Sequence, residues 1–235
     1  MSTQGFFRLS GLAVVVGGVV SVVCQLVGAF YNGNTTSYAA QPIYITSEFV
    51  LAAATILLLL GLPGIYASRA QGFGVVGLVG MALLFIAGVM LGVFANLEDA
   101  MVTPWLAAQA PSLANGFGPQ PFFAFYNVQE LALVSGSVLL AIPLLCRRVS
   151  PRWPAIALLL SAGLGVVTFF FDAFPSTLAS ALLVAVPPIL LLVALAALGY
   201  QTWTQPSPDT AISSSRPSVE TGRPATTTTN FEGVR

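Results

Sequence analysis

The sequence of 235 residues contains no histidine and no lysine, and only 7% of its residues are charged. Soluble domains carry about 25% charged residues, so the composition excludes an ordinary soluble domain. Without histidine the chain lacks the most common general base and metal ligand, and without lysine it lacks Schiff-base chemistry. Eight arginines are balanced by eight acidic residues, which leaves no basic excess to bind nucleic acid.

Cysteine is almost as scarce. Cys24 and Cys146 are the only two, and each lies in an apolar run. A structural zinc site needs four ligands, and a disulfide framework needs more cysteines than these. We therefore expect no metal site, no cofactor and no enzymatic activity.

The chain is instead rich in hydrophobic residues. Its residues are 56% hydrophobic, with a mean hydropathy of +0.88. A bilayer core about 30 Å thick needs roughly 20 apolar residues per helix. Six segments meet this requirement: 9–31, 47–66, 73–96, 127–146, 154–173 and 177–200. The sequence thus predicts an all-α integral membrane protein, a six-helix transmembrane bundle over residues 1–203 in contact with the lipid bilayer.

The arginines predict the orientation of this bundle. Outside the C-terminal tail they lie before the first segment or in every second loop: Arg8, Arg69, Arg147, Arg148 and Arg152. The alternate loops, 32–46, 97–126 and 174–176, contain no basic residue. By the positive-inside rule both termini are cytoplasmic, and we expect a multi-pass protein of the plasma (inner) membrane. Residues 204–235 are rich in Ser, Thr and Pro, a composition typical of a disordered tail.

Recurring charges suggest that the bundle contains an internal repeat. Arg8, Arg69 and Arg152 each precede an apolar segment, and Glu48 and Glu130 start stretches that align without a gap. Charged residues are rare here, so these coincidences favour three tandem two-helix hairpins. The units would span about 8–68, 69–151 and 152–203. The alternative is that apolar helices with similar flanks resemble one another without duplication.

Small and polar residues follow single helix faces. Gly88 and Gly92 share one face, as do Ser161 and Gly165, and small residues allow helices to approach closely. Gln25 lies in a comparable polar stripe of the first segment. The adjacent Pro187 and Pro188 predict a kink in the last segment, which serves either as a static packing bend or as a hinge.

Acidic residues gather at the outer ends of the expected helices. They are Glu48, Glu98, Asp99, Glu130 and Asp172. Glu48 and Glu130 are explained without function if they lie in first turns, since Asn127 to Glu130 has the spacing of a capping box. Asp99 and Asp172 fall near expected helix C-termini, where the helix dipole disfavours negative charge. These two are therefore the better candidates for ion or proton binding.

Two functions remain compatible with this pattern. The first is a non-catalytic accessory or interaction subunit that works with a membrane-protein partner or as a homo-oligomer. The second is a small transporter or channel in which the outer carboxylates attract cations or share protons. The two differ in one expectation, because a transporter needs acidic residues that face a common cavity inside the bundle.

Overall fold

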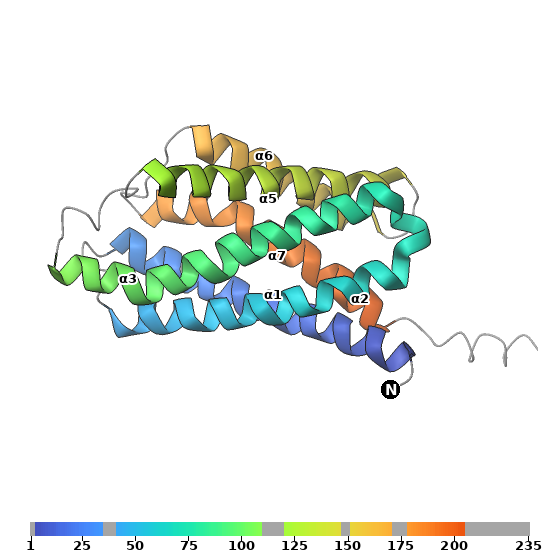
Figure 1. Ribbon diagram of the computed structural model, residues 1–235, viewed down its shortest axis with the longest axis horizontal. Coiled ribbons are helices and arrows are strands. Elements are labelled where there is room, and N and C mark those ends of the chain that lie inside the picture. Colours follow the sequence, from blue (N-terminus) through green and yellow to red (C-terminus); the bar gives the residue numbers. More distant parts are fainter. Residues whose placement is uncertain (1–2, 35–40, 110–119, 147–150, 171–177, 205–235) are drawn as a thin grey trace, which may run out of the picture. The chain divides into compact units, whose positions relative to one another are not determined.

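The computed structural model describes residues 3–34, 41–109, 120–146, 151–170 and 178–204. Within these ranges all regular structure is helical (Figure 1). The elements are α1 (Thr3–Asn34), α2 (Pro42–Ala87), the π-helix η2 (Gly88–Ala95), α3 (Asn96–Gln109), α5 (Gln120–Cys146), α6 (Trp153–Phe170) and α7 (Leu178–Thr204). The tail at 204–235 lies outside the described residues beyond Thr204, so the expectation of disorder there stays a prediction.

The described helices form five continuous stretches where the sequence predicted six segments. Segments 47–66 and 73–96 belong to one helical stretch, because α2, η2 and α3 follow one another without a break from Pro42 to Gln109. Regular geometry is lost within α2 at Arg69 (φ −131°, ψ 15°) and Gly74 (φ 59°, ψ −162°). Figure 1 shows the chain reversing direction there, so α2 has a first arm before Arg69 and a second arm after Gly74.

The reversal depends on a glycine. Gly74 has a positive φ. In this conformation the Cβ atom of any other residue would crowd the backbone, so glycine is favoured here. The Tyr66 hydroxyl donates to the Gly74 carbonyl at 3.4 Å, and the rings of Tyr66 and Phe73 lie 6.3 Å apart. These contacts hold the two arms of α2 in a hairpin.

Four helical segments are long and apolar enough to cross a membrane: Gln4–Tyr31, Pro42–Leu106, Ala124–Cys146 and Leu178–Thr204. Trp153–Phe169 is apolar but shorter. Large hydrophobic side chains also lie on the outside, among them Val75, Leu131 and Leu60, which are 75%, 70% and 69% exposed. Water would penalise such a surface, whereas lipid would not, and the fold is consistent with a membrane bundle.

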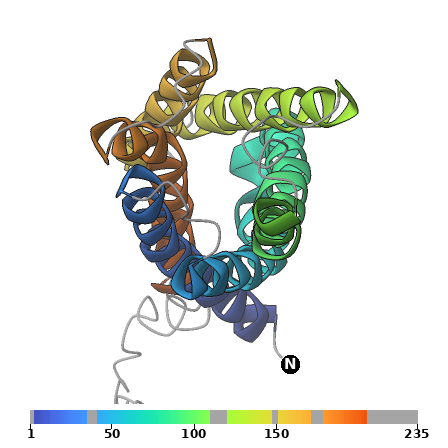
Figure 2. The ribbon, with the colours of Figure 1, turned by 90° about the vertical axis from the view of Figure 1, so that its left-hand side faces the viewer.

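The helices of residues 3–204 are arranged in a ring of sequence neighbours (Figure 2). α1 packs on the first arm of α2, where Gly17 approaches Ala54 and Leu58, and the second arm packs on α5, where Gly80 approaches Leu140. α5 then contacts α6, α6 contacts α7, and α7 closes the ring against α1. The short loops of the chain thus place consecutive helices side by side.

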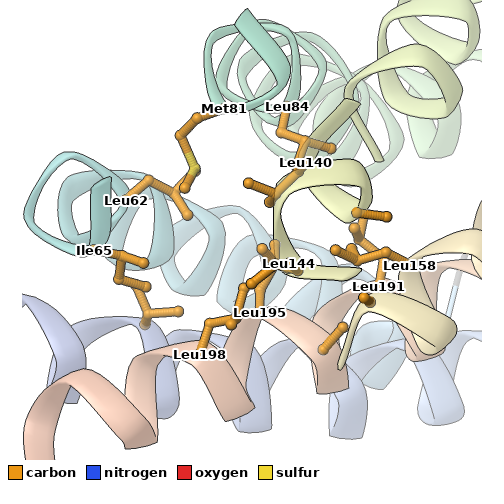
Figure 3. Packing of buried hydrophobic residues seen from close by; sticks show 14 of the residues in the cluster. Leu62, Ile65, Met81, Leu84, Leu140, Leu144, Leu158, Leu191, Leu195 and Leu198 are labelled. Carbon is orange, nitrogen blue, oxygen red and sulfur yellow. The ribbon is translucent and has the colours of Figure 1, made fainter. Parts of the chain in front are cut away.

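A cluster of leucines fills the ring near the α2 reversal. Figure 3 shows side chains from both arms of α2 and from α5, α6 and α7 converging there. Six of the side chains labelled in Figure 3 are at most 1% exposed: Leu62, Ile65, Leu140, Leu144, Leu158 and Leu198. Ile65 precedes Arg69 by one helical turn and Leu198 lies near the end of α7, so this leucine cluster closes the bundle at its arginine-bearing end.

Candidate functional site

The structure removes the capping explanation for two of the acidic residues. α2 begins at Pro42 and α5 at Gln120, and neither has an acidic residue in its first turn. Glu48 and Glu130 therefore lie further inside their helices, where free backbone N–H groups are no longer available to them. The interpretation of Asn127 to Glu130 as a capping box is wrong, because the helix starts seven residues earlier.

Asp99 is also placed differently from the expectation. It lies in the first turn of α3, but η2 runs directly into α3 and the helix continues to Gln109. Asp99 is thus inside a continuous helical stretch and not at a C-terminus. Asp172 lies outside the described residues, so its role stays a prediction.

Glu48 and Asp99 line one cavity of about 340 Å³ inside the ring. The cavity is bounded by α1, α2, η2, α3, α5 and α7. Its polar lining, which we call the carboxylate end, comprises Gln25, Tyr44, Glu48, Asn96 and Asp99. Three separate helices contribute these side chains, which the sequence alone could not place together.

The two carboxylates, of which Glu48 is buried and Asp99 half-buried, have few compensating contacts. Glu48 is only 6% exposed and is hydrogen-bonded by the Tyr44 side chain one turn earlier. Asp99 accepts a hydrogen bond from the Thr103 hydroxyl at 3.1 Å. Two ionised carboxylates lining one cavity would repel each other, and among the described residues that line the cavity none is basic. The site therefore favours a cation or a shared proton.

The neighbouring Glu98 does not belong to this site. It is absent from the cavity lining and instead accepts a hydrogen bond from the Tyr126 hydroxyl of α5 at 3.4 Å. One residue of helical rotation thus separates a carboxylate that faces the cavity from one that packs against a neighbouring helix.

The other part of the cavity is lined by hydrophobic side chains. Its walls carry leucines from both arms of α2 and from α7: Leu58, Leu59, Leu62, Leu84, Leu191 and Leu195. All six also belong to the leucine cluster that closes the bundle. The cavity therefore has a charged part and an apolar part that ends on this cluster.

Two small polar side chains of α1 complete the wall. Ser21 is fully buried, and its hydroxyl has no hydrogen-bond partner in the described part of the chain. Cys24 lines the same cavity and is 7% exposed. A buried hydroxyl without a partner is costly, so Ser21 offers an unused hydrogen bond to whatever occupies the cavity.

The π-helix η2 shapes one side of the cavity. Gly88 and Gly92 both line it, where Gly92 lies against the Thr55 side chain and Gly88 against Leu59. Their contacts are therefore with the first arm of α2. The Asn96 side chain donates to the Gly92 carbonyl at 2.8 Å. Single π-helical turns are rare and recur at functional sites. The sequence pattern did not predict this π-helix.

Glu130 faces a second cavity of about 250 Å³, between η2, α5, α6 and α7. Ser137, Ser161, Gly165 and Thr168 line it as well. Gly165 leaves room for the acid, because a Cβ there would lie 3.0 Å from Glu130 Oε1. Glu130 is therefore separated from Glu48 and Asp99, although both cavities share Leu91, Leu133, Val184 and Pro188 in their walls.

The proline pair of α7 lies between the two cavities. Pro188 lines both and Pro187 lines the second, while α7 remains a single helix from Leu178 to Thr204. The Ser161 hydroxyl donates to the Pro187 carbonyl at 2.7 Å, which ties α6 to α7 at this point. Ser161 therefore contributes a polar contact between helices in addition to its small size.

Several residues that line the cavity were not predicted from the sequence. Tyr44, Thr55 and Asn96 line the cavity, yet in the sequence they look like interfacial or neutral positions. Their spacing from Glu48 and Asp99 offered a signal: Tyr44 precedes Glu48 by four residues and Asn96 precedes Asp99 by three, which places each pair on one face.

Within the described residues, no group of three or more Cys, Asp or Glu could hold a metal ion.

Comparisons with protein families, with curated proteins and with solved structures found no match for this chain. The function is therefore inferred from the two cavities and from the residues that line them.

Proposed function

We propose that the chain is a small membrane transporter that takes up a positively charged solute or protons at Glu48 and Asp99. The observation that carries this proposal is the cavity shared by the buried Glu48 and the half-buried Asp99, in which no described lining residue is basic. Placing carboxylates inside a membrane bundle is costly, and acidic residues there commonly mark ion or proton pathways.

The cavity favours this function over the accessory subunit that the sequence left open. A subunit that acts only by packing gains nothing from a polar hollow between its helices, because filling it with side chains would stabilise the bundle. The apolar exterior is no argument for a partner protein, because lipid accounts for it.

The membrane topology is part of the same proposal. The two arms of α2 would count as separate spans, which with α1, α5, α6 and α7 gives six spans in three hairpins. The arginines assign both termini and the α2 reversal to the cytoplasmic side of the plasma membrane. The carboxylate end of the cavity then lies toward the outer side and the leucine cluster toward the cytoplasm.

Transport would require the leucine cluster to open. In this arrangement it blocks the bundle between the cavity and the arginine-bearing end. Carriers expose a central site to the two sides in turn by moving groups of helices against each other. Pro187 and Pro188 lie in α7 at the cavity wall, and we assign them the hinge because prolines remove backbone hydrogen bonds within a helix.

The test is charge movement by the purified protein in liposomes. Currents on a solid-supported membrane would be recorded after separate jumps in pH, in Na⁺ and in choline concentration. We expect a current above that of empty liposomes for at least one of these cations, and its loss in Glu48→Gln and Asp99→Asn. Glu98→Gln is the matched control, because it removes a neighbouring charge outside the cavity and should keep the current.

A wild-type protein that gives no current with any of the three would overturn the transporter and favour the accessory subunit. Equal loss in Glu98→Gln and Asp99→Asn would show that general charge, and not the cavity, matters. The abundance of each variant in the membrane, measured by immunoblotting, separates lost function from lost folding.

A further inference from the structure

We infer that the cavity beneath Glu48 and Asp99 binds an amphiphilic organic cation, a molecule with one ammonium-type head and a hydrocarbon body. This inference names the substrate class of the transporter proposed above and rests on that proposal. It is argued from the two unlike parts of the cavity.

The carboxylate end suits a cationic head. Glu48 and Asp99 come from different helices and face the same space, and an organic cation between them would relieve their repulsion. Tyr44 also lines this end, and aromatic residues are the type that attracts ammonium groups. Ser21, whose buried hydroxyl has no hydrogen-bond partner in the described part of the chain, lines the same cavity.

The leucine-lined part suits a hydrocarbon body. Leu58, Leu59 and Leu62 on one arm of α2 line the cavity together with Leu191 and Leu195 on α7. A space lined in this way is poorly hydrated, and apolar cavities of this kind take up apolar ligands. A volume of about 340 Å³ is within the range of pockets that enclose small organic ligands, about 300–1,000 Å³.

An inorganic cation fits this site less well. Na⁺ or a proton would occupy the carboxylates and leave the leucine-lined space empty, and an empty apolar cavity destabilises the fold. A neutral hydrocarbon would fill the leucine-lined space but leave the two carboxylates of the cavity without a cationic partner. Only a molecule that combines both parts satisfies the whole cavity.

The experiment uses Cys24 as a native reporter of occupancy. Because Cys24 lines the cavity and Cys146 is exposed elsewhere on α5, Cys146→Ser leaves a single thiol at the site. The rate of its reaction with an apolar maleimide would be measured in maltoside detergent against increasing octyltrimethylammonium. We expect at least tenfold protection at saturation. The matched control is Cys24→Ser, in which the labelling of Cys146 should not respond to the same compound.

Chain length and charge test the two parts of the ligand separately. Each added CH₂ from butyl- to octyltrimethylammonium should tighten half-protection about fourfold, and tetramethylammonium should protect weakly. Octyl sulfate, which has the same tail and the opposite charge, should not protect. Glu48→Gln and Asp99→Asn, each in the Cys146→Ser background, should weaken protection at least tenfold, whereas Glu98→Gln in that background should not.

The outcomes distinguish this inference from the proposed transport. Protection that is equal for octyl sulfate, or that is unchanged in Glu48→Gln, overturns the cationic head. Protection by tetramethylammonium as strong as by the octyl compound overturns the hydrocarbon body. Currents without protection would leave a transporter of small cations and refute this ligand class. Protection without currents for octyltrimethylammonium would support the site and refute transport.

Discussion

Two buried serines show how much the surroundings of one hydroxyl decide. Ser161 is 3% exposed and donates to the Pro187 carbonyl of a different helix. Ser21 is fully buried against the cavity and has no partner in the described part of the chain. The same side chain therefore stabilises the bundle in one place and costs stability in the other.

This difference predicts opposite effects of the same substitution. Ser161→Ala removes a hydrogen bond between helices and should lower the free energy of unfolding by about 1 kcal/mol. Ser21→Ala removes only an unsatisfied group and should leave stability unchanged or slightly higher. Thermal unfolding of both variants in detergent measures the difference. An equal loss in Ser21→Ala would show that its hydroxyl is bonded in the folded protein.

At the scale of helices, neighbouring helices of the ring pack closely against each other at glycine residues. An ideal Cβ on Gly80 would lie 2.7 Å from the Leu140 backbone nitrogen, and one on Gly11 would lie 2.6 Å from the Gly199 carbonyl oxygen. The first contact joins the second arm of α2 to α5, and the second joins α1 to α7. A side chain at either position would separate two helices, whereas Gly163 on α6 meets nothing within 4 Å.

Gly80→Ala should therefore destabilise the bundle by about 1–3 kcal/mol, because the obstructing atoms are backbone and cannot rotate away. Gly163→Ala is the matched control, since it adds the same methyl group in open space and should be neutral or gain up to about 1 kcal/mol of helix propensity. Unfolding midpoints of the two purified variants provide the comparison. Similar midpoints would argue against the close approach of α2 and α5.

At the scale of the whole molecule, charge is sorted toward opposite ends of the bundle. Arg69 lies at the α2 reversal and donates to Gln201 near the end of α7 at 3.0 Å. Glu48 and Asp99 lie on the helical stretch that runs away from this reversal on either side. The positive-inside rule then predicts which end faces the cytoplasm.

The predicted topology can be checked by labelling single cysteines in a variant that lacks Cys24 and Cys146. A cysteine at Gly116 should react with an impermeant maleimide applied to intact cells, because its loop has no basic residue. A cysteine at Ser214 should react only after the membrane is permeabilised, because its tail carries three arginines. Both positions lie outside the described residues, and the reverse pattern of labelling would refute the orientation.

The sequence was sufficient for the class of fold because hydropathy is a local property. Runs of about 20 apolar residues predict membrane helices whatever their neighbours are, and the long apolar helices α1, α5 and α7 bear this out. It was also sufficient to single out the acidic residues near the helix ends, because charge is so rare in this chain, but it favoured Asp99 and Asp172 over Glu48 and Glu130. The first residue of each helix was harder to predict from the sequence. The helix of Glu130, for example, starts at Gln120, in a stretch of Pro and Phe that resembles a loop.

Only the tertiary structure decided which of these acids share a site. Helix periodicity fixes the face of a residue but not the helix that this face meets, so the sequence could not separate Glu130 from the pair Glu48 and Asp99. The ring of helices brings α1, α2, η2, α3, α5 and α7 around one cavity and leaves Glu130 in another. Leucines that look alike along the chain divide in the same way. Leu62 and Leu195 both line the cavity and belong to the cluster that closes it, whereas Leu60 and Leu131 face outward, because packing between distant segments determines burial.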